Sequence, residues 1–262
     1  MNQLRPSVSI VIPAYNEERY LSLCLESIRH QTIAPSEVIV VDNNSTDQTA
    51  AIAQRYPFVR VISESQQGIV FARNAGFNVA QGDIIARIDA DTQLPENWVE
   101  IVTEFFEDPN NQRAIFTGCC YFYNLKNGKL AGKIYNVVVP RANYLMLGHY
   151  FPCGSNSALP RQAWQAIKDQ TCDQVDIHED LDLGVHLRRA NYKVSYHPYV
   201  QVGVLARRVI TDHAKLWEYL SMWPRTYRRH GTQRWVLIVP IIIGLWAGSY
   251  GLLTLEKIRS NT

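Results

Sequence analysis

Short apolar runs alternate with amphipathic stretches along the first ninety residues of the chain. The apolar runs predict β-strands. The amphipathic stretches, in which apolar residues recur every three to four positions, predict α-helices. Strands are expected at Ser7–Ile12, Glu37–Val41, Phe58–Ile62 and Ile84–Ile88, with helices at Asn16–His30, 45–55 and Gly68–Ala80. This alternation indicates an α/β fold with a doubly wound sheet, in which ligands bind at the carboxyl ends of the strands.

After residue 91 the pattern is less regular. It predicts helices at Trp98–Phe106, Arg161–Ile167 and Asp180–Arg189, and strands at Ala114–Tyr123 and Lys193–His197. The globular pattern ends near residue 213, so we divide the chain into a globular domain (1–212), an aromatic and basic segment (213–234), an apolar segment (235–255) and a short tail (256–262).

The apolar segment carries no charge from Trp235 to Leu255. Its length matches the roughly 20 residues that cross a hydrocarbon core, and soluble helices rarely stay apolar all round for this length. We therefore expect a C-terminal transmembrane helix, in preference to a buried helix of a soluble core. Four arginines lie in the ten residues before it, so the positive-inside rule predicts a single pass through the cell inner membrane with the large N-terminal part in the cytoplasm.

The segment 213–234 is rich in tryptophan, tyrosine and arginine. Two interpretations stay open: an amphipathic helix that lies at the membrane interface, or a packing helix that covers the core.

Composition limits the classes of function. Twenty-six basic and 24 acidic residues give a net charge of +2, which does not favour a nucleic-acid-binding protein. Five cysteines form no Cys-x-x-Cys pair. An odd number without metal-binding spacing predicts reduced, mostly buried thiols instead of a disulfide or zinc framework.

The tripeptide Asp89-Ala90-Asp91 directly follows the fourth predicted strand. Side chains two residues apart on a strand point the same way, so the two carboxylates are expected to lie together. A pair of carboxylates suits a hard divalent cation, Mg²⁺ or Mn²⁺, completed by phosphate oxygens. The alternative is a solvated acidic turn.

Further polar clusters follow the other predicted strands, at Pro13–Glu17, Asp42–Asp47, Gln67-Gly68 and Arg73-Asn74. Each alone is compatible with turn and capping chemistry. Together they suit a base, a ribose and a diphosphate with its metal. No glycine-rich phosphate loop follows a strand, so the diphosphate charge would be met by metal and arginine.

A last acidic cluster, Glu179-Asp180, begins a predicted helix. The helix dipole holds a carboxylate there in the ionised form, which favours a general base over an acid, although an acidic helix cap explains it equally well. The loop 154–157 either lines an acceptor site or is a plain connection.

The order of these motifs resembles the inverting family 2 glycosyltransferases with the GT-A fold, of the membrane-tethered bacterial type, from about Ser7 to Arg208. The resemblance implies that residues 1–212 form a catalytic domain with a mixed, Rossmann-like sheet and flanking helices. It rests on five motifs: Val-Ile-Pro-Ala-Tyr-Asn-Glu (11–17), Val-Val-Asp-Asn-Asn-Ser-Thr-Asp (40–47), Gly-Ile-Val-Phe-Ala-Arg-Asn-Ala-Gly (68–76), Asp-Ala-Asp (89–91) and Glu-Asp-Leu-Asp-Leu (179–183).

The resemblance also implies roles for individual residues. Asp91 would ligate the divalent cation together with Asp89, which would also lie near the ribose and diphosphate. Asp180 would be the catalytic base, and Glu179 would contact or orient the acceptor. The nucleotide would be bound by residues of the remaining motifs: Pro13, Tyr15, Glu17, Asp42, Asn44 and Arg73.

The chain departs from the family pattern at two places. Asn43 replaces the second acidic residue of the usual Asp-Asp pair. A histidine that often completes the metal shell has no firm counterpart; His197 and His213 are candidates, each favoured as a surface or packing residue. The family position is instead followed by Arg207-Arg208, which would clamp the diphosphate or, alternatively, face anionic lipid.

The expected function is transfer of a sugar from a nucleotide-diphospho-sugar to an acceptor hydroxyl with inversion and without an enzyme nucleophile. The acceptor would be a saccharide or lipid-linked intermediate of envelope glycan synthesis. Two alternatives stay open: a catalytically silent membrane partner that binds nucleotide-sugar, and a sugar nucleotidyltransferase, which the missing triphosphate loop disfavours. The sequence leaves the sugar, the base, the acceptor and the oligomeric state open.

Overall fold

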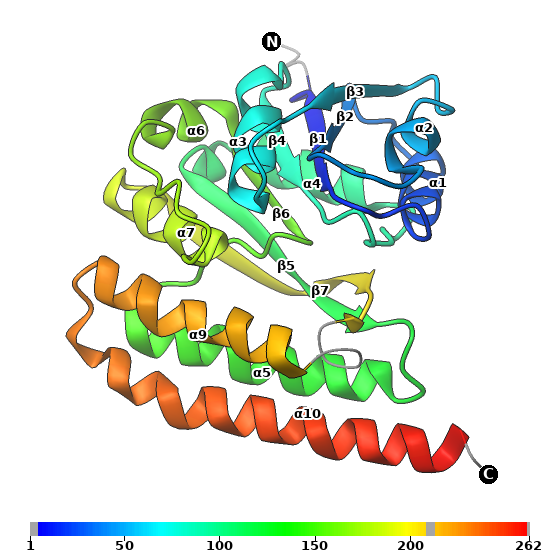
Figure 1. Ribbon diagram of the computed structural model, residues 1–262. Helices are drawn as coiled ribbons and strands as arrows, with labels where there is room; N and C mark the ends of the chain where they lie inside the picture. Colours follow the sequence, from blue (N-terminus) through cyan, green and yellow to red (C-terminus); the bar gives the residue numbers. More distant parts are fainter. Residues whose placement is uncertain (1–4, 208–212, 261–262) are drawn as a thin grey trace.

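The computed structural model describes residues 5–207 and 213–260, and its centre is a seven-stranded mixed sheet (Figure 1). The strand order is β3-β2-β1-β4-β6-β5-β7. The first four strands are mutually parallel, β6 runs antiparallel to both its neighbours, and β5 and β7 pair in parallel. The strands are β1 Val8–Ala14, β2 Glu37–Asp42, β3 Val59–Ser63, β4 Ile84–Arg87, β5 Ala114–Phe122, β6 Ser157–Pro160 and β7 Lys193–Val204.

Helices cover both faces of the sheet. The α-helices are α1 Leu21–Arg29, α2 Thr49–Ala53, α3 Ile69–Val79, α4 Trp98–Glu107, α5 Gly128–Leu147, α6 Arg161–Ile167, α7 Glu179–Arg189, α9 His213–Arg229 and α10 Val239–Ser260. Short 3₁₀ helices lie at η1 Pro109–Asn111 and η2 Gln233–Ile238. The four predicted N-terminal strands and the helices between them are thereby confirmed, with ends shifted by a few residues.

The central strands are mostly apolar because both of their faces are buried; the exceptions include Ser9 in β1 and Arg87 at the end of β4. Ile10 on β1 packs in one cluster with Leu25 of α1 and Trp98 of α4, whereas the adjacent Val11 packs in a second cluster with Phe77 of α3. Successive side chains of β1 therefore pack into two different cores, one on each face of the sheet, as expected of parallel strands covered on both faces.

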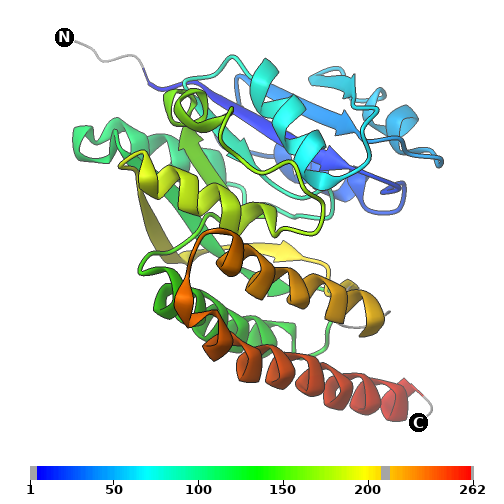
Figure 2. The same ribbon diagram turned by 60° about the vertical axis from the view of Figure 1, so that its left-hand side comes forward.

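A third layer lies beyond the β5–β7 side of the sheet. Helices α5 and α9 lie against the rest of the molecule, and α10 runs along their outer side (Figures 1 and 2). Trp223 and Tyr227 of α9 are buried with Val139 of α5 and Leu181 of α7. The packing interpretation of the aromatic segment therefore holds for this face of α9, while Trp217 on the same helix is 45% exposed.

The apolar segment does not form the single membrane-spanning helix that the sequence predicts. It is divided between η2 and α10, and among the described residues no helix combines the length and the apolar character needed to cross a bilayer. Part of the apolar run is used for packing inside the protein, because Ile238 and Ile242 are buried against α5 and α9 side chains.

Candidate active site

The centre of the candidate site is a buried arginine, Arg87, at the end of β4. Its Nη2 lies 3.3 Å from Oδ1 of Asp89 and 3.1 Å from Oε1 of Glu179, and its Nη1 donates to Oδ1 of Asp180. One guanidinium thus joins carboxylates from two motifs that lie about ninety residues apart in the chain. We did not predict a role for Arg87 from the sequence; the available signal was a charged residue within an apolar run, two positions before Asp89.

Burial and nearby charges shift the pKa values of Glu179 and Asp180, both in the first turn of α7, in opposite directions. Burial favours the neutral form of Glu179, but the positive charges of Arg87, His178 and Arg73 outweigh it and lower its pKa. Burial, supported by the negative charges of Glu179 and Asp89, raises the pKa of Asp180, and Arg87 offsets this only in part. A carboxylate with a raised pKa is a stronger base, which is the property needed in proton abstraction near neutral pH.

The loop before β6 touches this centre. The backbone N–H of Gly154 donates to Oδ2 of Asp180 at 2.8 Å. A Cβ atom at Gly154 would lie 2.6 Å from the Arg87 guanidinium, so only glycine lets the backbone approach. The loop 154–157 is therefore more than a plain connection, because it orients the candidate base.

Arg73 supports the site from behind. Its side chain is fully buried, and its Nη1 donates to the carbonyl oxygen of Glu179 at 2.9 Å. Its Nε and Nη2 donate to Oδ1 of Asn74 at 3.0 and 2.9 Å. This arrangement argues against direct contact between Arg73 and a nucleotide, and makes Arg73 a residue that positions the start of α7.

The Asp89-Ala90-Asp91 tripeptide lies in a turn instead of a strand, because β4 ends at Arg87. The turn is closed by hydrogen bonds from Thr92 N to the Asp89 carbonyl and from Asp89 N to Thr92 Oγ1. The Asp89 side chain is 40% exposed. Tyr123, directly after β5, donates its hydroxyl to the carbonyl oxygen of Asp91 at 3.1 Å, which ties the end of β5 to the turn.

Arg207 joins the first motif to the acidic turn. Arg207 forms a two-pronged ion pair with Glu17, with nitrogen–oxygen distances of 2.9 and 2.6 Å, and lies 3.5 Å from Oδ2 of Asp91. The guanidinium also sits over the ring of Tyr20. Arg207 therefore lies beside the acidic turn, and its role as a diphosphate clamp stays a prediction. Arg208 and the side chain of His213 lie outside what the structure describes.

Asp42 ends β2, and its Oδ1 is buried without a hydrogen-bond partner among the described residues. The neighbouring Asn43 donates to the carbonyl oxygens of Glu64 and Gln66 at 2.9 and 2.7 Å, and its Oδ1 accepts from Gly68 N at 2.8 Å. A carboxylate could not donate these bonds, so the structure explains the departure from Asp-Asp at this position.

The other predicted residues lie around this end of the sheet with differing exposure. Tyr15 is 48% exposed, whereas Pro13 is buried within β1. Asn44 has a positive φ of 61° and donates to the carbonyl oxygen of Ser65. His197 stacks on Phe116 with a centroid distance of 4.8 Å, so it is the packing residue that we favoured over a metal ligand.

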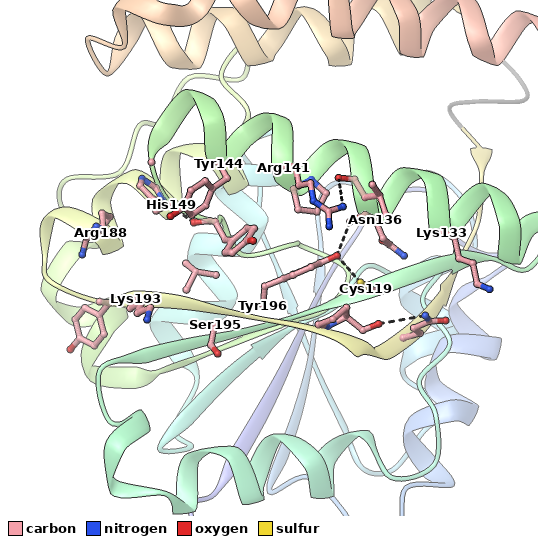
Figure 3. Close-up of a pocket in the computed structure, with 18 residues that line it drawn as sticks. Cys119, Lys133, Asn136, Arg141, Tyr144, His149, Arg188, Lys193, Ser195 and Tyr196 are labelled. Atoms are coloured by element: carbon pink, nitrogen blue, oxygen red, sulfur yellow. Dashed lines mark hydrogen bonds between the residues drawn. The ribbon is translucent and has the colours of Figure 1, made fainter.

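A separate groove of about 920 Å³ lies between α5 and β7 (Figure 3). Its lining contains four cationic side chains, Lys133, Arg141, Arg188 and Lys193, and no carboxylate among the described residues. None of the site residues predicted from the sequence lines it. The groove is thus distinct from the carboxylate centre around Arg87.

Comparison with known proteins agrees with this geometry. The model of the family described as Glycosyl transferase family 2 matches residues 9–167. Chondroitin synthase of Escherichia coli is 34% identical over 156 residues, which cover 56% of this chain and 22% of that protein. Glycosyltransferase AglE of Haloferax volcanii is 37% identical over 107 residues, which cover 38% of this chain and 35% of that protein. The chain therefore matches only about a third or less of either relative.

Solved structures share the fold. The mannosyltransferase PcManGT of Pyrobaculum calidifontis, in complex with GDP-Man and Mn²⁺, has a TM-score of 0.67 at 20% identity, covering 97% of this chain and 76% of that chain. TarS of S. aureus in complex with UDP-GlcNAc has a TM-score of 0.61 at 16% identity, covering 84% and 65%. The expected GT-A-like mixed sheet with flanking helices is confirmed. Because the family model matches more than half of the chain, the protein belongs to glycosyl transferase family 2.

Proposed function

We propose that this chain transfers a sugar from a nucleotide-diphospho-sugar to an acceptor hydroxyl, with inversion of configuration. The observation that carries the proposal is the assembly of Asp89, Glu179 and Asp180 around the buried Arg87 at the carboxyl ends of the strands. The relatives named above support a sugar donor, since two of the solved structures contain GDP-Man and UDP-GlcNAc.

The residues present fit a divalent cation. Asp89 and Asp91 offer carboxylate oxygens, which Mg²⁺ and Mn²⁺ prefer, and the Asp89 carboxylate is exposed enough to reach a ligand. A cation held there supplies positive charge that stabilises the departing diphosphate. Arg207, which lies 3.5 Å from Asp91, supplies a second positive charge for the same phosphates.

Asp180 is the proposed general base. Its Oδ1 is bound by Arg87 and its Oδ2 by the backbone of Gly154, so the carboxylate is held in one orientation. In this role Asp180 takes the proton of the acceptor hydroxyl as that oxygen attacks the anomeric carbon from the side opposite the diphosphate. The bond to the diphosphate breaks, the configuration inverts, and no enzyme nucleophile is needed. Glu179 orients the acceptor.

The nucleotide is proposed to lie over the ends of β1 and β2. The buried Oδ1 of Asp42, which has no hydrogen-bond partner in the part of the chain that the structure describes, supports this placement, because a donor group of a nucleotide base would satisfy it. Tyr15 and Asn44 flank this position and are proposed to contact the base or ribose.

We also propose that the acceptor is a saccharide or a lipid-linked intermediate and that the chain works on the cytoplasmic side of the inner membrane, at its surface. The support is a set of exposed apolar side chains on η2 and α10, namely Val236, Leu237 and Ile243, near the exposed Arg228 and Arg234. Apolar side chains with adjacent cations suit an anionic lipid surface. Flotation with neutral and anionic vesicles tests this part separately.

The test of the function is a panel of UDP-, GDP- and dTDP-sugars, with binding and hydrolysis measured with and without Mn²⁺. We expect metal-dependent turnover of one donor. Absence of binding to any donor by folded protein would contradict the proposal and favour the silent-partner alternative. Formation of a nucleotide-sugar from nucleoside triphosphate and sugar phosphate would instead indicate a nucleotidyltransferase.

A further inference from the structure

Four side chains of metal-binding type converge behind the candidate site, on the face of α7 that meets α9. Asp182 and His186 lie one turn apart on α7, Cys172 lies in the loop before it, and His230 directly follows α9. One ligand atom of each lies within 4.8 Å of the ligand atoms of the other three. Oδ1 of Asp182 is at the centre, 2.8 Å from Nε2 of His230 and 3.4 Å from Nε2 of His186.

The cluster leaves a buried group unsatisfied. His186 is only 7% exposed; among the described residues its Nδ1 makes no hydrogen bond, and its Nε2 has only a long contact of 3.4 Å with Oδ1 of Asp182. An unpaired polar group at this depth costs free energy unless something binds it. Because Nε2 points toward Asp182 and not toward solvent, a stronger partner for this nitrogen has to lie inside the cluster.

The chemistry of the four ligands selects the ion. One thiol, two imidazoles and one carboxylate are the ligands of tetrahedral zinc sites, and a site filled by four protein ligands is structural instead of catalytic. Zinc bonds of about 2.0–2.3 Å place the ligand atoms about 3.3–3.8 Å apart. The most distant ligand atoms would therefore approach by about 1 Å, and Oδ1 of Asp182 and Nε2 of His230, now 2.8 Å apart, would separate by about 0.5 Å.

We propose that Cys172, Asp182, His186 and His230 bind a structural Zn²⁺ ion. The thiol of Cys172 loses its proton to solvent on binding and coordinates as thiolate. This ion is distinct from the divalent cation proposed at Asp89 and Asp91, which has oxygen ligands only.

An ion at this position would help to hold the candidate site together. Asp182 lies two residues after Asp180 on the same helix, and His230 is anchored at the end of α9. The start of α7 already contacts α9 through His178, whose Nε2 lies 2.8 Å from the Tyr219 hydroxyl. Zinc would fasten the next turn of α7 to α9 and to the preceding loop, and so hold the proposed base in place.

The test uses the full chain, freed of metal by a chelator and then titrated with Co²⁺ as a spectroscopic probe of zinc sites. We expect one tightly bound Co²⁺ with the strong visible bands of tetrahedral coordination and a near-ultraviolet thiolate-to-cobalt band. Added Zn²⁺ should displace it. A wild-type protein that gives only the weak spectrum of octahedral Co²⁺, without the thiolate band, would overturn the proposal without any variant.

Variants then assign the ligands. Cys172→Ser should abolish the thiolate band, and His186→Asn should weaken Co²⁺ binding by at least about 100-fold, more than is typical for loss of a second-shell partner. The matched controls are Cys119→Ser and His30→Asn, which remove a thiol and an imidazole outside the cluster. Asp91→Asn, which alters only the separate site with oxygen ligands, should leave the tetrahedral bands and the thiolate band unchanged. Retention of the full spectrum in both cluster variants would contradict the assignment.

Discussion

Arg87, at the end of β4, and Asp180, in the first turn of α7, form a buried ion pair that joins the two halves of the candidate site. The same guanidinium also binds Glu179 and Asp89. Its own pKa is raised, because the three carboxylates outweigh a burial effect that favours the neutral form. The position of the proposed base is therefore set by a strand residue that lies far from it in the sequence.

Replacement of Arg87 should damage both stability and transfer. Arg87→Gln leaves neighbouring carboxylates buried without their cation, which typically costs about 3–5 kcal/mol in the free energy of unfolding. Urea unfolding measures this loss. Arg60→Gln is the control, because Arg60 pairs with Glu37 at the surface, where such a pair contributes about 0–1 kcal/mol. Equal effects of the two substitutions would contradict the central role of Arg87.

Gly154→Ala should be far more harmful than a helical Gly→Ala change elsewhere. The added methyl group would meet the Arg87 guanidinium at 2.6 Å and push apart Arg87 and Asp180. We expect a loss of about 1–3 kcal/mol in the free energy of unfolding, as for other overpacked sites, with loss of sugar transfer. Gly244→Ala in α10 meets no atom within 4 Å and should be neutral or slightly stabilising. Full activity of Gly154→Ala would refute the contact.

Much of the fold could be predicted from the sequence because the first four strands are buried on both faces. Ile10 and Val11 point into different cores, so nearly every position of β1 is apolar. The run at 235–255 is also continuously apolar, but part of it packs against other helices of the protein. Its Ile238 and Ile242 are buried against other helices, and hydropathy alone cannot distinguish protein from lipid as the partner.

The candidate site was only partly predictable. Asp89, Asp91 and Asp180 could be identified as candidate site residues from the sequence, because each follows or begins an element with a clear pattern. Arg87 was missed because its partners on α7 become neighbours only in the folded chain. Arg73 resembles a nucleotide-binding residue in its motif, yet the structure buries it behind Glu179.

The proposed zinc ligands could not be predicted from the sequence either, because they come together only in the folded chain. The cysteine spacing predicted no zinc framework, since the ligand pattern has a single cysteine. The Asp182–His186 pair is one turn of α7, but Cys172 and His230 reach it only through the loop before α7 and the end of α9. Such a set is recognisable only once the helices are placed.

Arg207 should affect nucleotide and metal binding in opposite directions. Arg207→Gln removes a positive charge 3.5 Å from Asp91 and breaks the pair with Glu17. We expect about tenfold weaker binding of nucleoside diphosphate in the presence of Mn²⁺, because a charge-assisted bond to phosphate is lost. Affinity for Mn²⁺ alone should stay equal or rise a few-fold, since repulsion at Asp91 falls. Calorimetry with each ligand checks this, and parallel loss of both affinities would contradict it.

The thiol of Cys153 should be unusually inert. Burial, followed by the negative charge of Asp180, raises the pKa of Cys153 to about 12, so the group is a neutral thiol at pH 8. The rate at which iodoacetamide alkylates Cys153 should keep rising with pH well beyond about 8.5, the pH at which a free cysteine is half ionised. Asp180→Asn should increase the rate at a given pH. A rate that levels off near the ordinary value would refute the predicted environment.

The most direct test of the account compares Asp180→Asn with the wild type in two assays, donor binding and sugar transfer. Asp176→Asn, an exposed change four residues earlier, is the control. We predict that Asp180→Asn binds the nucleotide-sugar with metal as the wild type does but transfers sugar about 10²–10⁴-fold more slowly, as expected for loss of a general base. Transfer at the wild-type rate by folded Asp180→Asn protein would contradict the assignment of Asp180 as the base.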